Sequence, residues 1–150
     1  MKFSKIEPKP HIKARILATI IDYALYTIFC WVYIYTFNES SSPGEMTVNG
    51  VLALPIFIVW FIYFVVTEAS GGATLGHYLC KLKVVKTNGG KLSIGDAFKR
   101  RICDFIDIGL YGLPAIICVS KTDKYQRVGD LLANTLVIKQ SDITETEVVF

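Results

Sequence analysis

One acidic residue interrupts the longest apolar segment of the chain. Asp22 lies within Ile16–Phe37, where every other side chain is uncharged. An aspartate at the centre of a membrane helix costs about 2.5–3.5 kcal/mol of insertion free energy, so it must keep its proton or find a partner. Arg15 lies about 10 Å away along a helix axis, and we therefore expect the partner to come from another element. Asp22 could bind a proton or a small cation, or it could only fix helix packing through hydrogen bonds.

A second group of ionisable residues lies just beyond the ends of the apolar segments. Its members are Glu68, Asp104, Asp107, Asp123, Asp130, Arg15, Arg100, Arg101 and Arg127. We expect a layer of ion pairs at the membrane interface, to which His77 adds a side chain that titrates near neutral pH. For Lys99, Arg100 and Arg101 we favour extended side chains that reach water and anchor a helix end.

The remaining motifs offer little support for enzyme chemistry. His11 and His77 lack metal-ligand spacing, and the four cysteines form no Cys-x-x-Cys pair. The segment Gly71–Gly76 lacks the Gly-Lys-Ser/Thr ending of a phosphate-binding loop. Asp22 and Asp107 could share a proton as an aspartyl pair, but the flanking glycine pattern of intramembrane aspartyl enzymes is absent. We therefore expect a protein that is not an enzyme and that holds no metal and no cofactor.

The composition indicates where these residues act. Of the 150 residues, 52% are hydrophobic and 19% are charged, whereas an average soluble domain is about 45–50% apolar and about 25% charged. Charge avoids two segments that are expected to be membrane helices, over 14–37 and 50–67, each close to the roughly 20 residues that cross a bilayer. The lipid bilayer is the expected environment. The net charge of +3 then reflects topology and anionic headgroups and not nucleic-acid binding.

A third apolar region is interrupted. Ser93 and Asp96 match a capping box, which predicts a helical region over 94–120. Gly109, Gly112 and Pro114 break this region, and its apolar part is too short for a simple crossing. We favour a broken or re-entrant hairpin, which is tolerated where it is buried in protein, over a third crossing.

Basic residues mark one side of the membrane. They gather before the first helix and over 81–101, whereas the loop over 38–50 contains none. The positive-inside rule then places the N-terminus and residues 67–101 in the cytoplasm and residues 38–50 outside.

The cytoplasmic part is expected to contain a small sheet. Asn88-Gly89 is a hairpin signal between strands over 81–86 and 91–93, and a strand over 135–139 could join them. The expected fold class is mainly α, with two transmembrane helices, a broken or re-entrant hairpin and this short sheet in one domain over 1–139. The tail, 140–150, is acidic and expected to be loose.

Three segments carry a resemblance to a known family. They are ARILATIIDYAL (14–25), ATLGHYLCKLKVVKTNGGKLSIGDAFKRRICDFID (73–107) and QRVGDLLANTLVI (126–138). In this order and spacing the chain resembles the RDD family of bacterial membrane proteins, named for one arginine and two aspartates. The resemblance implies that Arg15 and Asp22 are the arginine and the first aspartate. It implies Asp130 as the second aspartate, with Asp107 as its rival.

The chain departs from the family pattern at two places. It has Gly76-His77 where the family usually has Gly-Lys, and Ala133-Asn134-Thr135 where the family often has Ala-Gly-Thr. If the family's lysine is functional, His77 replaces a fixed charge with one that can titrate near neutral pH.

The resemblance implies a bacterial inner (plasma) membrane and a role in transport of unidentified solutes, including exchange of cations for protons. In that reading Asp22 binds a proton or a small cation, gated by Arg15 and Asp130. Glu68, His77, Asp104, Asp107 and Arg127 form the supporting polar layer. Two crossings and a hairpin are too few to enclose a pathway, so a homo-oligomer or a partner membrane protein is expected. The alternative is a membrane scaffold or assembly module that docks a partner through its cytoplasmic sheet and basic helix.

Overall fold

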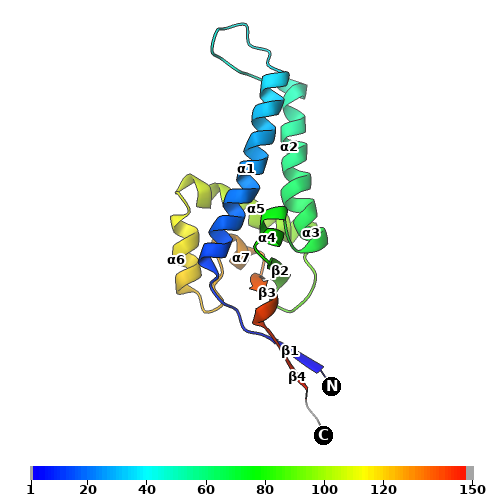
Figure 1. Ribbon diagram of the computed structural model, residues 1–150, viewed down its shortest axis with the longest axis vertical. Coiled ribbons are helices and arrows are strands. Elements are labelled where there is room, and N and C mark those ends of the chain that lie inside the picture. Colours follow the sequence, from blue (N-terminus) through cyan, green and yellow to red (C-terminus); the bar gives the residue numbers. More distant parts are fainter. Residues whose placement is uncertain (1, 148–150) are drawn as a thin grey trace.

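The protein is an elongated, mainly helical molecule (Figure 1). The computed structural model describes residues 2–147, and it describes the side chains of residues 6–139 and 141–143. Two long helices lie side by side and project from a block of shorter helices and strands. Both chain ends lie beyond this block, at the end of the molecule opposite the loop that joins the long helices.

Two helical stretches are long and apolar enough to cross a membrane, which confirms the expected pair of spans. The first is α1 (Ile12–Thr36) and the second covers Gly50–Gly71. The second is assembled from η1 (Gly50–Ala53), α2 (Leu54–Trp60), the π-helical η2 (Phe61–Val66) and α3 (Thr67–Gly71). Most large apolar side chains of these stretches are exposed, as expected of helices that face lipid and not a protein core.

The third apolar region is a sharply bent helix pair. The two helices, α5 (Ile94–Gly109) and α6 (Leu113–Lys121), are bent by 115° at their junction. Gly112 adopts φ +76°, a left-handed conformation that glycine accepts readily, and Pro114 lies in the first turn of α6. At its other end α5 begins with the expected capping box of Ser93 and Asp96. The region is therefore broken where the sequence indicated.

The small sheet contains the expected strand over 135–139 but not the expected hairpin. β2 (Leu82–Lys86) pairs antiparallel with β3 (Thr135–Lys139), and 91–93 is not a strand. The chain does turn at Asn88-Gly89, where Gly89 donates to the Lys86 carbonyl at 2.9 Å. A hairpin turn of type I′ needs positive φ at both central residues, but of these two only Gly89 has it. The predicted hairpin was therefore wrong, because the chain leaves the turn to start α5.

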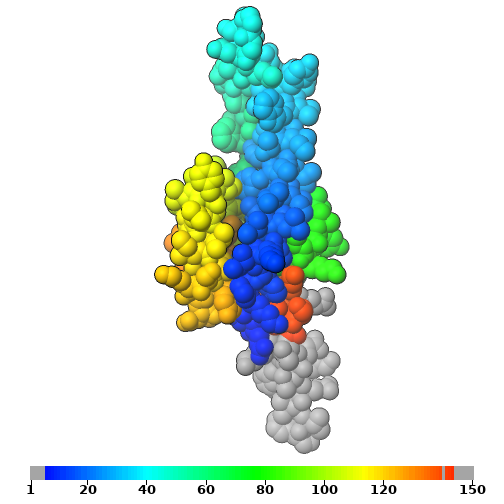
Figure 2. Space-filling model, turned by 60° about the vertical axis from the view of Figure 1, so that its left-hand side comes forward, coloured from blue at the N-terminus to red at the C-terminus, as the bar shows by residue number. Residues whose placement is uncertain are grey.

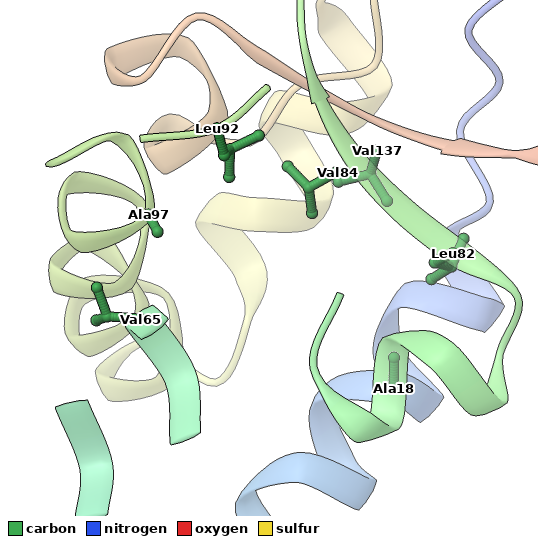
Figure 3. Packing of buried hydrophobic residues seen from close by; sticks show 7 residues of the cluster. All are labelled: Ala18, Val65, Leu82, Val84, Leu92, Ala97 and Val137. Atoms are coloured by element: carbon green, nitrogen blue, oxygen red, sulfur yellow. The ribbon is translucent and has the colours of Figure 1, made fainter. Parts of the chain in front are cut away.

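A compact apolar core lies where the sheet meets the helices (Figure 3). Its buried members are Ala18, Val65, Leu82, Val84, Leu92, Ala97 and Val137. They come from α1, η2, the sheet and the start of α5. Two short helices complete the block, α4 (Leu75–Leu79) and α7 (Val128–Leu132).

The C-terminal tail, expected to be loose, contains a short helical turn and a strand. After η3 (Gln140–Asp142), β4 (Ile143–Glu147) pairs antiparallel with β1 (Lys2–Ile6). Asp142 joins the two ends of the chain, because its carboxylate accepts from the Lys139 backbone at 2.8 Å and lies 2.6 Å from His11 Nε2. Residues 148–150 lie outside the described part of the chain.

Candidate functional site

Asp22 lies in a site where four groups bind its carboxylate. We call Asp22, Tyr63, Thr74, Gly76 and His77 the Asp22 site. Asp22 is fully buried, and its Oδ1 accepts from the Tyr63 hydroxyl at 2.7 Å and from the Gly76 backbone at 2.7 Å. Its Oδ2 accepts from the Thr74 hydroxyl at 2.5 Å and lies 3.3 Å from His77 Nδ1. The partners thus come from η2 and from the segment that forms α4, and not from Arg15.

Gly76 allows α4 to approach α1 closely enough to make these contacts. A Cβ atom at this position would collide with the Ala18 carbonyl oxygen and would lie 2.8 Å from the Asp22 carboxylate. Both distances are below those that side chains tolerate, so a residue with a side chain would push α4 away from α1. The glycine in Gly76-His77 therefore has a packing role, and the histidine that follows it is placed beside Asp22.

The hydrogen bonds of Thr74 assign the proton on His77. Thr74 has one hydroxyl proton, which it donates to Asp22, so its oxygen accepts from His77 Nδ1 at 2.8 Å. His77 therefore carries a proton on Nδ1. Burial lowers the pKa of His77 and the hydrogen bond to Asp22 opposes this shift; the net direction is downward.

Six buried or half-buried charged residues form a ring of alternating sign beside the Asp22 site, and the exposed Asp123 of the expected layer is not among them. The ring runs Asp130, Arg100, Glu68, Arg101, Asp104, Arg127 and back to Asp130. Arg15 is attached to it through Asp130 at 3.2 Å, and Asp107 lies 3.9 Å from Arg127. These eight residues, four arginines and four acids, balance in formal charge. We call them the charge ring.

Asp130 is the member with the most arginine partners. Its Oδ1 lies 2.8 Å from Arg100 Nη1 and 3.6 Å from Arg127 Nε, and its Oδ2 accepts from Arg15 Nη1 at 3.2 Å. Burial alone would raise the pKa of Asp130, but these three arginines hold it below its usual value. Gly129 makes the contact possible, since a Cβ there would lie 2.8 Å from the Arg100 carbonyl oxygen. Asp130 thus joins α1, α5 and α7.

Two of the residues expected to reach water are instead buried. Arg100 is 0% exposed and Arg101 is 2% exposed, and both pair with Glu68. The expectation that they anchor a helix end in water was wrong for these two; Lys99 is exposed. Helical spacing does not distinguish a buried arginine from an interfacial one, because the difference depends on Glu68, which lies on another element.

The Asp22 site and the charge ring are neighbours, and each contains residues from α1 and from the second membrane-crossing stretch, Gly50–Gly71. Tyr23, next to Asp22, donates to Asp104 Oδ2 at 3.1 Å. Phe64, next to Tyr63, stacks on Tyr23 at 4.8 Å, and the Arg101 guanidinium lies 5.1 Å from its ring centre. Tyr63 and Phe64 both lie in the π-helical turn of η2, a feature often found at functional sites. A change at Asp22 therefore has a short packed route to the ring.

Sequence reasoning missed part of the Asp22 site. Tyr63 lies in an apolar run, and Thr74 and Gly76 lie in a segment in which no partner of Asp22 was predicted. The signal was present, since a buried carboxylate needs donors and a hydroxyl within an apolar helix is a natural one. The aspartyl pair considered at the outset is not formed, because Asp107 belongs to the charge ring and Asp22 to the other site. Within the described residues, no group of three or more His, Cys, Asp or Glu side chains is placed to hold a metal ion.

Two apolar helices of membrane-crossing length, with a buried aspartate in one of them, define a helical membrane protein. A sequence model of the RDD family matches residues 9–134, and the chain belongs to this family. The match confirms the resemblance and contains both the Asp22 site and the charge ring. No curated protein and no solved structure matches the chain.

Proposed function

We propose that this RDD-family chain is a transport or transport-accessory membrane protein in which the Asp22 site binds a proton. The observation that carries the proposal is the direct contact of a fully buried aspartate in a membrane-crossing helix with a histidine. Ionisable groups inside membrane helices are costly and typically mark ion or proton pathways. Histidine is the side chain whose ordinary pKa lies closest to neutral pH.

The geometry favours a proton over a small cation at this site. The Tyr63 and Thr74 hydroxyls and the Gly76 N–H donate to the Asp22 carboxylate, and the Nδ1–H of His77 is shared between Thr74 and Asp22. A metal cation would need oxygen ligands in their place, whereas a proton can enter on His77 Nε2 and leave the four contacts intact. Arg15 binds Asp130 and the Val137 carbonyl, which disfavours a role for Arg15 as a gate in contact with Asp22. The supporting role of the charge ring is then to hold α1, α3, α5 and α7 in place around the site.

The proposal includes an orientation and an assembly. Basic residues before α1 and around β2 favour a cytoplasmic N-terminus and sheet in a bacterial inner membrane. The bent pair of α5 and α6 then enters and leaves on that side as a re-entrant hairpin; α6 lies along the N-terminal half of α1 (Figure 1). Two crossings cannot enclose a pathway, so a second copy or a partner membrane protein completes it. We assign no catalytic reaction to the chain.

Proton flux in proteoliposomes tests the proposal. The full chain is reconstituted with a pH-sensitive dye inside the vesicles, and wild type is compared with Asp22→Asn and with the control Asp123→Asn, which changes an exposed aspartate. We expect Asp22→Asn to abolish proton movement and the control to retain it. Full flux with Asp22→Asn, or no flux with wild type alone and with candidate partners, would refute the proposal.

A membrane scaffold is the second candidate, favoured by the charge ring. The ring is internal and balanced, which is what a rigid docking module requires. Arg100 and Arg101 of the basic helix are buried, so they are not available to a partner. The basic docking surface is instead on β2 and the residues around it, where Lys81, Lys83 and Lys91 are exposed. In this case Asp22→Asn lowers thermal stability in proportion to any loss of function. Loss of flux at unchanged stability would exclude it.

A further inference from the structure

A cavity of about 310 Å³ lies between α1, α5 and α6, next to the charge ring. Its walls are largely apolar side chains, among them Ile16 and Ile20 of α1, Ile108 of α5 and Ile116 of α6. Figure 2 shows α6 (yellow) standing beside the N-terminal half of α1 (blue). The volume is at the lower end of the range for small-molecule sites, about 300–1,000 Å³.

One end of this cavity is charged. Arg15, Asp104, Asp107 and Arg127 line it together with the apolar walls. Asp107 is 4% exposed, and among the described residues no group donates a hydrogen bond to either of its carboxylate oxygens. The nearest cation is Arg127 Nη1, 3.9 Å away, which is too far for a hydrogen bond. A buried carboxylate without donors is costly, so a donor on the occupant of the cavity would be strongly favoured.

The same end also presents unused donors. Arg15 Nε and Arg127 Nη2 are buried and have no hydrogen-bond partner among the described residues. The residues that line the cavity thus include two arginines that suit an anion, one carboxylate that suits a cation, and an apolar wall. The four charged lining residues sum to zero, so the matching occupant carries both charges and is neutral overall.

We propose that this cavity binds a zwitterionic phospholipid with a primary ammonium headgroup. The ammonium donates to Asp107, the phosphate accepts from Arg15 and Arg127, and an acyl chain lies along the isoleucines. The walls support a lipid because they continue into exposed apolar surface: Ile20 is 59% exposed and Ile108 is 47% exposed. The occupant can therefore enter sideways from the bilayer. The charged end lies at the first turns of α1, the depth at which headgroups are found.

The primary ammonium is the specific part of this proposal. A quaternary choline headgroup carries the same charge but has no N–H to donate to Asp107. An anionic phosphatidylglycerol headgroup satisfies the arginines but offers Asp107 only neutral hydroxyl donors and no opposite charge. A charge-assisted hydrogen bond is stronger than a neutral one, so we expect phosphatidylethanolamine to bind about tenfold more tightly than phosphatidylcholine with the same acyl chains.

Native mass spectrometry of the full chain in detergent tests the proposal, with the three lipids titrated separately. We expect bound phosphatidylethanolamine to exceed phosphatidylcholine in wild type and in the control Asp123→Asn. Asp107→Asn should reduce phosphatidylethanolamine to the level of phosphatidylcholine. Asp107 makes one long ion contact, so this variant is expected to fold. Ala115→Phe, which places a ring in the cavity, should reduce binding of all three.

Each alternative result overturns the inference. A preference for phosphatidylglycerol would make the cavity an anionic-lipid site, and equal binding of all three would make it unspecific. A phosphatidylethanolamine preference that survives Asp107→Asn or Ala115→Phe would place the lipid elsewhere. If Asp107→Asn does not fold, the wild-type order of the three lipids and the Ala115→Phe result still decide. None of these outcomes depends on proton flux, so the two proposals can fail separately.

Discussion

Asp130→Asn isolates the contribution of the charge ring to stability. The amide has nearly the shape of the carboxylate, so the change removes charge and little volume. Asp130 is fully buried and faces Arg100 at 2.8 Å, Arg15 at 3.2 Å and Arg127 at 3.6 Å. Removing one partner of a buried ion pair costs about 3–5 kcal/mol. Glu68 stays beside Arg100 and Asp104 beside Arg127, so we expect about 3 kcal/mol.

Thermal unfolding of the full chain in detergent measures this loss. Trp60 is a suitable fluorescent reporter, because its indole lies 6.2 Å from the Phe64 side chain, ring centre to ring centre. Phe64 in turn contacts Arg101, a member of the charge ring. A loss of about 3 kcal/mol corresponds to a decrease in Tm of about 6–12 °C for a chain of this size. The control Asp123→Asn, at an exposed position, should stay within about 0.5 kcal/mol of wild type.

A double-mutant cycle with Arg15→Gln tests the assigned partner. Asp130→Asn leaves the ring with one excess positive charge, and adding Arg15→Gln restores the balance. The double variant should therefore be less destabilised than the sum of the two single variants, by about 0.5–3 kcal/mol. If the two effects add, Arg15 and Asp130 are not coupled. If Asp130→Asn is as stable as the control, the ring does not stabilise the fold.

Three further predictions follow from other contacts. Burial holds the pKa of His77 below its ordinary value, so below about pH 6.5 the unfolded chain takes up a proton that the folded chain takes up only at lower pH. Thermal unfolding should therefore show stability falling below that pH, less so in His77→Asn, and parallel profiles would refute this. Gly76→Ala should cost about 1–3 kcal/mol by overpacking against Ala18, whereas Gly71→Ala, which meets nothing within 4 Å, should be near neutral in the same assay; equal effects would contradict the close approach. Asp142→Ala removes the oxygen that contacts His11 and accepts from the Lys139 backbone and should speed amide hydrogen exchange in β1 and β4, while unchanged exchange would show that this contact is dispensable.

The two spans and the broken third helical region could be predicted because each is specified locally. The two spans follow from runs of apolar residues, and the break before α6 follows from Gly112 and Pro114, which act on the backbone at their own positions. The β2–β3 pairing illustrates the opposite case. Asn88-Gly89 favours a hairpin by its local chemistry, but the capping box at Ser93 and the burial of Leu92 take the chain into α5. Tertiary contacts overrode a local signal.

The candidate site could be predicted by residue type but not by pairing. Asp22 was identified because its cost is visible in the sequence, and Arg15 and Asp130 because the family pattern contains them. Their partners come from segments far apart in the chain: Arg15 pairs across 115 positions and Asp22 reaches Thr74 across 52. No spacing rule for a helix or strand connects such positions. The same limit explains why Arg100 was expected to face water.

The two sites differ in how easily they can change conformation. The charge ring connects α1, α3, α5 and α7 through buried ion pairs, so moving one of these elements against another would break at least one pair, at about 3–5 kcal/mol. The Asp22 site instead joins α1 to α4 through hydrogen bonds from side chains and one backbone group. A second proton on His77 would give its imidazole a positive charge beside the Asp22 carboxylate. A conformational step driven by protonation is therefore expected between α4 and α1, or between whole copies of the chain. Movement within the ring is disfavoured, and a scaffold would need neither step.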